Sequence, residues 1–334
     1  MKLILAILSL FMMLGCNMVH EWPGEEPVDP TNVDSEVIIS CQVELDVEAI
    51  ITKGVLYPEF TDEECQKYER KFYIEIYEQM SSGTEKVFDG LFFKELRDFS
   101  DLQFSAELHA KQYCFLIWMD YAKKEDHSDM FFSIENLTSI KILPKDRYLA
   151  GSDLKDAQTL LYPIDLRNSR EWFRRIVIDL PLSRPVAKIS FEATDIVEYA
   201  SKMGCTENYD EFLKDYSLKF EYNGYLATGF NAVSQKLNDS DVGYHFGAVP
   251  TFIMESQNAL LGFDYVFVNG ESSSVNLSVE IVDKNGMTVN RVDNIVVPIY
   301  RGKQTIVRDK FFTREYNPGI GIDPGFDGEF NVYV

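Results

Sequence analysis

Alternation between apolar and polar residues is the main pattern along this chain. At residues 72–77, 187–192, 218–222 and 330–334 every second side chain is apolar. That period puts the apolar side chains on one face of an extended segment and predicts half-buried β-strands. Further strands are predicted at residues 37–47, 86–93, 140–144, 176–180, 260–268, 275–282, 295–300 and 305–312.

The run at residues 113–121, YCFLIWMDY, is apolar almost throughout and is bounded by polar stretches. Its length fits a strand better than a helix, and the lack of alternation predicts burial on both faces. We expect this strand at the centre of the first domain.

Helix signals are few. Thr61, followed three residues later by Glu64, is a capping-box pattern and predicts a helical turn within residues 61–70. Residues 193–203 predict a second short helix that ends at Gly204.

Turn signals separate most of the strands. Asn223-Gly224 predicts a tight hairpin that joins residues 218–222 to residues 225–227. A second reversal is predicted at residues 283–286, DKNG. Residues 145–170 and 234–244 show little periodicity, and we predict loops there.

The spacing of these elements predicts the fold class. Many short strands, with turns every 8–12 residues or so, are typical of all-β sandwiches with few short helices. The chain has 334 residues, which exceeds the size of most single cores, so two domains are expected. We predict an N-terminal sandwich at residues 36–184 and a C-terminal sandwich at 185–334, divided near Pro181 and Pro185.

The first 35 residues predict export and anchoring. Lys2 and an apolar run at residues 3–14 form a secretory signal at residues 1–15 that is too short to span a membrane. Leu14-Gly15-Cys16 resembles the bacterial lipobox, which implies cleavage before Cys16 and acylation of its thiol. The alternative is an unmodified cysteine in an uncleaved leader. Residues 16–35 contain three prolines and several acidic residues, and they predict an extended tether.

Charge narrows the range of partners. Asp and Glu number 54 against 32 Lys and Arg, which gives a formal net charge of −22. An acidic surface repels phosphate backbones, so we expect no nucleic-acid partner. Acidic residues after Cys16 only loosely resemble an export signal for the outer leaflet, so both leaflets of the outer membrane stay open.

The other four cysteines, Cys41, Cys65, Cys114 and Cys205, have no CxxC spacing. In an exported protein an even number of cysteines allows disulfides. The sequence does not choose between one disulfide and four buried thiols.

No catalytic motif is present. The chain has 4 histidines, none in HExxH, and neither GxSxG nor a Gly-rich phosphate loop occurs. The acidic segment 323–328 misses the spacing of a calcium loop and is better explained as a turn. We therefore predict no enzyme and no catalytic, cofactor-binding or metal-binding residues.

Four segments carry a family resemblance: RPVAK at 184–188, GFN at 229–231, LGFDYVF at 261–267 and GIDPGFDGEF at 321–330. They resemble Bacteroidales outer-surface lipoproteins similar to the FimB-type fimbrial anchoring subunits. The resemblance implies two transthyretin-like sandwiches and a role at the base of a fimbrium. Shaft subunits of that superfamily are cleaved after Arg or Lys ahead of the first strand, but the first arginine here is Arg70. This departure favours an anchor or accessory subunit.

The sequence therefore predicts a lipid-anchored adhesion protein on the cell surface. Its expected partners are membrane lipid, through Cys16, and a fimbrial subunit that engages the C-terminal strand at residues 329–334 by strand addition. The alternative is a surface glycan-binding lipoprotein, because 3 Trp, 18 Tyr and 24 Phe supply many stacking surfaces.

Overall fold

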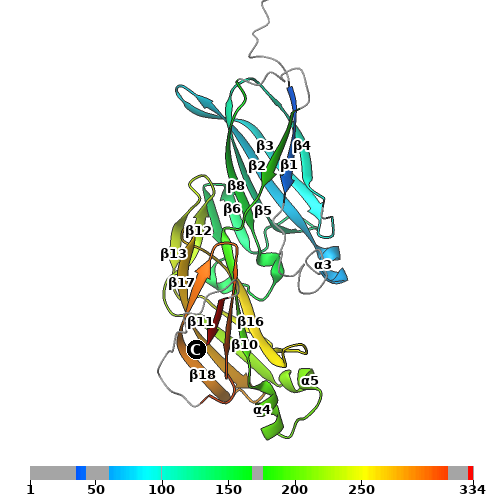
Figure 1. Ribbon diagram of the computed structural model, residues 1–334, viewed down its shortest axis with the longest axis vertical. Helices are drawn as coiled ribbons and strands as arrows, with labels where there is room; N and C mark the ends of the chain where they lie inside the picture. The colour runs from blue at the N-terminus through cyan, green and yellow to red at the C-terminus, as the bar shows by residue number, and fades with distance from the viewer. Residues whose placement is uncertain (1–34, 43–59, 99, 168–175, 315–329, 334) are drawn as a thin grey trace, which may run out of the picture.

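The computed structural model describes residues 35–42, 60–98, 100–167, 176–314 and 330–333. Strands dominate these residues and the helices are short, so the all-β prediction is confirmed. The two halves of the sequence are stacked along the long axis of the molecule (Figure 1).

The strands and helices fall into two groups, those before residue 185 and those after it. Before residue 185 they are β1 (Ser35–Gln42), α3 (Asp62–Lys67), β2 (Tyr68–Met80), β3 (Gly83–Glu95), β4 (Leu102–Leu108), β5 (Gln112–Lys123), β6 (Phe132–Asn136), β7 (Ser139–Ile142), the 3-10 helices η1 (Lys145–Arg147) and η2 (Asp153–Lys155), β8 (Gln158–Asp165) and β9 (Ile176–Pro181). After residue 185 they are β10 (Val186–Ala193), α4 (Ile196–Lys202), α5 (Tyr209–Leu213), β11 (Tyr216–Tyr222), β12 (Leu226–Asn231), β13 (Lys236–Asp241), β14 (His245–Ala248), β15 (Thr251–Ile253), β16 (Asn258–Phe267), β17 (Ser272–Asp283), β18 (Thr288–Tyr300), β19 (Gln304–Asp309) and β20 (Phe330–Tyr333).

Within the described residues these strands form five sheets, which we call A to E. Sheet A (β4-β1-β9) packs on sheet B (β3-β2-β5-β8) in the first half. Sheet D (β15-β16-β10-β19-β20) packs on sheet E (β14-β11-β17-β18) in the second. Sheet C (β13-β12-β7-β6) lies between the two sandwiches (Figure 1).

The centre of the first sandwich is β5, as the sequence predicts. It lies between β2 and β8, and Phe115 and Ile117 pack in the core that sheets A and B enclose. The alternate residues Leu116 and Trp118 belong to the core on the opposite side of sheet B. The strand is therefore buried on both faces, which is why its sequence lacks alternation.

Sheet C takes strands from both sides of residue 185. Gly229 and Phe230 of β12 pair with Lys141 and Ile140 of β7. A Cβ on Gly229 would lie 2.4 Å from Oδ1 of Asn238, so glycine is needed for β13 to lie against β12. The predicted boundary at residue 185 falls between β9 and β10 and stays a prediction, but the halves share a sheet.

An aromatic cluster fills the junction of sheets B, C and D. The ring of Trp118 lies 5.5 Å from Phe132, 5.9 Å from Phe230 and 6.4 Å from Phe267, between centroids. All four side chains are buried. Since they come from β5, β6, β12 and β16, the core of the second sandwich continues up to sheet B.

A buried ionic cluster lies next to this aromatic junction. Lys155 Nζ is 2.6 Å from Oδ1 of Asp264, and the hydroxyl of Tyr222 donates to Oδ2 at 2.7 Å. Tyr148 donates to the same oxygen at 2.5 Å. Burial, reinforced by the neighbouring Asp264 carboxylate, raises the pKa of Tyr148 and Tyr222, so both keep the protons that they donate. Lys155 and Tyr148 precede residue 185 and their partners follow it, so the cluster joins the halves.

The predicted capping box is confirmed at the start of α3. Thr61 Oγ1 accepts from the backbone N–H of Glu64 at 3.1 Å, and the Glu64 carboxylate accepts from the backbone N–H of Thr61 at 2.8 Å. The second predicted helix is α4, and the chain leaves it at Gly204, where φ is +85°.

The hairpin prediction at Asn223-Gly224 is wrong. β11 pairs with β14 and β17, whereas β12 pairs with β13 and β7, so this turn carries the chain from sheet E to sheet C. A turn signal fixes where a chain bends, but the partner of the next strand depends on contacts that are distant in sequence.

Two of the predicted loops contain strands. β13 lies within residues 234–244, and β8 lies within residues 145–170. β13 is an edge strand with no buried residue, so nothing in its sequence selects an inward face. β8 begins with Gln158 and Thr159, which are buried although polar, and this removes the alternation.

We predict that Lys155→Met destabilises the fold by about 3–5 kcal/mol, because it leaves the Asp264 carboxylate buried without its cation. The free energy of unfolding in urea measures this effect. Lys202→Met is the matched control, since Lys202 pairs with Glu198 on the surface and its loss should cost under ~1 kcal/mol. Equal losses in the two variants would contradict the role of the buried cluster.

A second prediction concerns Asp120 on β5. Burial raises the pKa of Asp120 to about 7, against the opposing attraction of Lys71, whose Nζ is 3.7 Å away. The unfolded chain loses this proton near pH ~4, so the folded state binds it more tightly. The free energy of unfolding should therefore fall between about pH 4 and 7 relative to that of Asp120→Asn. Urea unfolding across this range tests the sign, and parallel pH profiles would refute it.

Candidate functional site

The predicted lipidation residue, Cys16, lies outside the described residues. The predicted C-terminal strand is present as β20, which forms the edge of sheet D. It pairs in parallel with β19, from Thr305 opposite Phe330 to Arg308 opposite Tyr333. In the described part of the chain β19 is its neighbour on one side and no strand lies on the other.

The four remaining cysteines are all free thiols. Cys41 is fully buried, and burial together with the charge of Asp101 raises its pKa to about 12. A thiol held in its neutral form is a weak nucleophile. Of the two alternatives that the sequence left open, the structure has four reduced thiols, but only Cys41 is buried, and Cys65, Cys114 and Cys205 are partly exposed.

No group of three or more His, Cys, Asp or Glu residues is arranged to hold a metal ion in the described ranges. No helix in those ranges is both long and apolar enough to cross a membrane.

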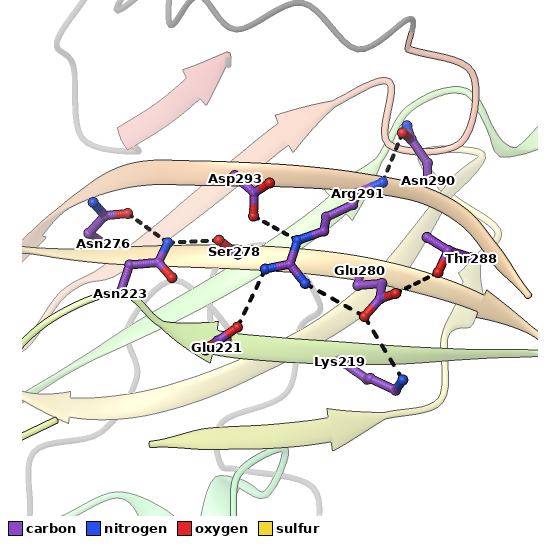
Figure 2. Close-up of polar contacts among 10 residues, drawn as sticks. All are labelled: Lys219, Glu221, Asn223, Asn276, Ser278, Glu280, Thr288, Asn290, Arg291 and Asp293. Atoms are coloured by element: carbon purple, nitrogen blue, oxygen red, sulfur yellow. Dashed lines mark hydrogen bonds and ion pairs between the residues drawn. The ribbon is translucent and has the colours of Figure 1, made fainter. Parts of the chain in front are cut away.

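A network of polar contacts lies on the outer face of sheet E (Figure 2). Along β11 and β17 apolar residues point into the core and polar residues point outward. We define the sheet E polar face as Lys219, Glu221, Asn223, Asn276, Ser278, Glu280, Thr288, Asn290, Arg291 and Asp293.

Arg291 is at the centre of this face. Its Nε lies 2.8 Å from Oδ1 of Asp293, and its terminal nitrogens lie 3.4 Å from Oε2 of Glu221 and 3.7 Å from Oε2 of Glu280. The hydrogen bond to Asp293 raises the pKa of Arg291. Burial opposes ionisation of Asp293, but hydrogen bonds from Ser278 and Arg291 outweigh it and lower its pKa. Asp293 therefore stays ionised as an acceptor, which suits binding better than proton transfer.

An amide pair continues the face toward sheet C. Asn223 Nδ2 donates to Ser278 Oγ at 2.7 Å and to Asn276 Oδ1 at 3.2 Å (Figure 2). The backbone N–H of Asn223 also donates to the carbonyl of Asn276 at 2.8 Å. These bonds hold the chain where it leaves β11, just before Tyr225.

Tyr225 borders two hollows. The larger has a volume of about 620 Å³ and is lined in part by β13, and the smaller has a volume of about 210 Å³ and is lined in part by Asn223 and Asn276. Tyr225, Ser274 and Val275 line both. The sequence does not predict this site, because the expected hairpin assigns Tyr225 to a paired strand. The one sequence signal at the site is Asn223-Gly224, which marks the turn from sheet E to sheet C.

The model of a family described as "Family of unknown function (DUF6562)" matches residues 30–334. The chain belongs to the DUF6562 family. No curated protein matches its sequence. The match covers both halves of this DUF6562 protein, including sheet C and both hollows.

Several solved structures are distantly similar to this DUF6562 protein. A candidate polysaccharide-binding protein (DUF1812) from Bacteroides thetaiotaomicron has 13% identity and a TM-score of 0.42, over 78% of this chain and 80% of that one. The fimbrial anchor protein Mfa2 from Porphyromonas gingivalis has 9% identity and a TM-score of 0.39, over 77% and 82%. The tip fimbrial protein Mfa3, also from Porphyromonas gingivalis, has 10% identity and a TM-score of 0.41, over 82% and 94%.

Proposed function

We propose that this DUF6562 protein is a lipid-anchored protein of the outer membrane that acts in adhesion or fimbrial assembly by contact with another protein. Acyl chains on Cys16 hold it in the membrane, and residues 16–35 form the tether. Residues 36–184 and 185–334 form the two sandwich domains that the tether presents at the cell surface. The anchor or accessory role follows from the sequence resemblance and from the lack of an arginine before Arg70.

The observation that carries this proposal is the position of β20. This strand has four residues, lies at the edge of sheet D and is held by a short parallel ladder with β19. If it is displaced, β19 exposes a row of unpaired N–H and C=O groups. An extended segment from a partner can then pair with β19 in its place, which is the strand-addition mode of recognition.

The glycan-binding alternative predicts a row of exposed aromatic side chains across one sheet. The described residues show most aromatic side chains packed in the cores, Trp118 among them. Tyr225 is an exception at 80% exposure, and it borders both hollows. A single aromatic residue at a polar hollow supports a local glycan site better than a broad glycan-binding face.

The lipid anchor is tested by Cys16→Ser. We expect the native protein to fractionate with the outer membrane and the variant to lose that association, since its acyl chains have no attachment point. Mass spectrometry of the native N-terminal peptide should find fatty acid on Cys16. A variant that stays membrane-bound, together with a native peptide free of lipid, would overturn the anchor.

Strand addition is tested with a chain that ends at residue 328. We expect it to bind a synthetic peptide of residues 329–334, with binding measured by fluorescence anisotropy. The matched control is the same peptide with proline at the positions of Asn331 and Tyr333, because proline cannot donate to a ladder. Equal binding of the two peptides, or none by either, would count against an exchangeable edge. Crosslinking in intact envelopes then identifies the protein that occupies it.

A further inference from the structure

Tyr225 is presented to solvent by the crossing between sheets E and C. It follows Gly224, whose φ of +146° is one that other residues rarely adopt. Its neighbour Leu226 is buried, while Tyr225 itself is 80% exposed, the highest value among the large apolar side chains of the described residues. A ring exposed at this position is free to stack against a ligand, and its hydroxyl can form a hydrogen bond.

The two hollows that meet at Tyr225 have the size of a binding site. The larger, at about 620 Å³, is within the range of roughly 300–1,000 Å³ that is common for ligand pockets. The smaller adjoins it through Ser274 and Val275, which line both. We call the two hollows together the trough; Tyr225 borders both, so its ring can contact a ligand that occupies either.

The lining of the trough is rich in neutral hydrogen-bonding groups. Asn238, Asn269 and Ser273 line the larger hollow, and Asn223 and Asn276 line the smaller. An amide offers both donors and acceptors, and a hydroxyl does the same. Sugar hydroxyls also donate and accept, and the C–H face of a sugar ring is apolar enough to lie on an aromatic ring. The combination of one exposed ring with amides and hydroxyls matches that chemistry.

The polar groups are held in place before any ligand arrives. Asn238 Nδ2 donates to the backbone oxygen of Thr138 at 2.8 Å, and Ser273 Oγ accepts from the backbone N–H of Asn269 at 3.3 Å. The smaller hollow has the Asn223–Asn276 pair described above. Groups that are already ordered lose little freedom on binding, which improves affinity.

The charges select a neutral ligand. Among the described residues that line the trough, Asp239 is the single ionisable carboxylate and none is Lys, Arg or His. Oδ2 of Asp239 is paired with Lys141 Nζ at 3.2 Å, which weakens the attraction of this carboxylate for a cationic ligand. An anionic polymer would meet no positive partner there and would approach a chain of net charge −22.

We propose that the trough around Tyr225 binds a short neutral oligosaccharide. The ring of Tyr225 stacks on one sugar, and the amides and hydroxyls of the two hollows bond to the hydroxyls of its neighbours. No residue of β20 lines the trough, so this proposal can be tested separately from strand addition and from the lipid anchor.

The test uses the purified full chain and titration calorimetry. The probes are cellohexaose, maltohexaose, mannohexaose and xylohexaose as neutral glycans and oligogalacturonate as the acidic one. We expect at least one neutral probe to bind and oligogalacturonate not to bind. Tyr225→Ala should weaken binding of that probe by about tenfold or more, which corresponds to the ~1.4 kcal/mol at the upper end for aromatic stacking.

Three further variants make the result specific. Tyr225→Phe keeps the ring and should bind within about threefold of the native protein, and Asn276→Ala should bind more weakly. Tyr162→Ala removes another partly exposed tyrosine, 38% exposed on β8, and should bind as the native protein does. Urea unfolding should be unchanged by Tyr225→Ala, since the side chain is largely in solvent.

Four outcomes would overturn the proposal. They are binding of no neutral probe, binding of the acidic probe alone, an affinity that Tyr225→Ala leaves unchanged, and an equal loss in Tyr162→Ala. A fifth outcome would also contradict it: slower amide hydrogen exchange at the trough when a peptide is added, with no change when a glycan is added, would mean that the site binds protein.

Discussion

The carboxylate of Asp264 is fully buried, and the placement of the two halves depends on how it is satisfied. Lys155 and Tyr148 reach it from the first half, and Tyr222 reaches it from the second. Separating the halves would strand a charge in an apolar environment, which costs several kcal/mol. The Trp118 cluster and the shared sheet C add burial around the same point. The two halves are therefore joined by buried polar contacts, a shared sheet and a continuous apolar core.

The same junction shapes the trough around Tyr225. One wall of the larger hollow is β13, which is tied to the first half by Asn238 to Thr138 and by Asp239 to Lys141. Ser273, Ser274 and Val275 of β17 also line this hollow. Every residue that lines it follows residue 185, but β13 is held in place by contacts with the first half. The buried cluster reaches the trough directly, because Tyr222 donates to Asp264 and also lines the smaller hollow.

The sequence predicted the features that depend on residues close in the chain and missed those that depend on residues far apart in it. The capping box at Thr61 and the buried character of residues 113–121 depend on near neighbours, and both were predicted. β13 was missed because its role is to pair with β12, which no local pattern records. β4 alternates along its whole length, so a strand could have been predicted there, but none was. The trough could not be predicted, because it forms where the chain passes from sheet E to sheet C at Asn223-Gly224, and the local sequence there indicates a hairpin.

Charge acts on this molecule at two ranges. At short range, three acids of the sheet E polar face pair with Arg291, and Asp239 pairs with Lys141. At long range, the net charge of −22 repels anionic polymers and other acidic surfaces. A neutral ligand is not excluded by the long-range field, and at the trough it meets hydrogen-bonding groups without an unpaired charge. Selection against anions therefore requires no dedicated residue, because the composition of the whole chain supplies it.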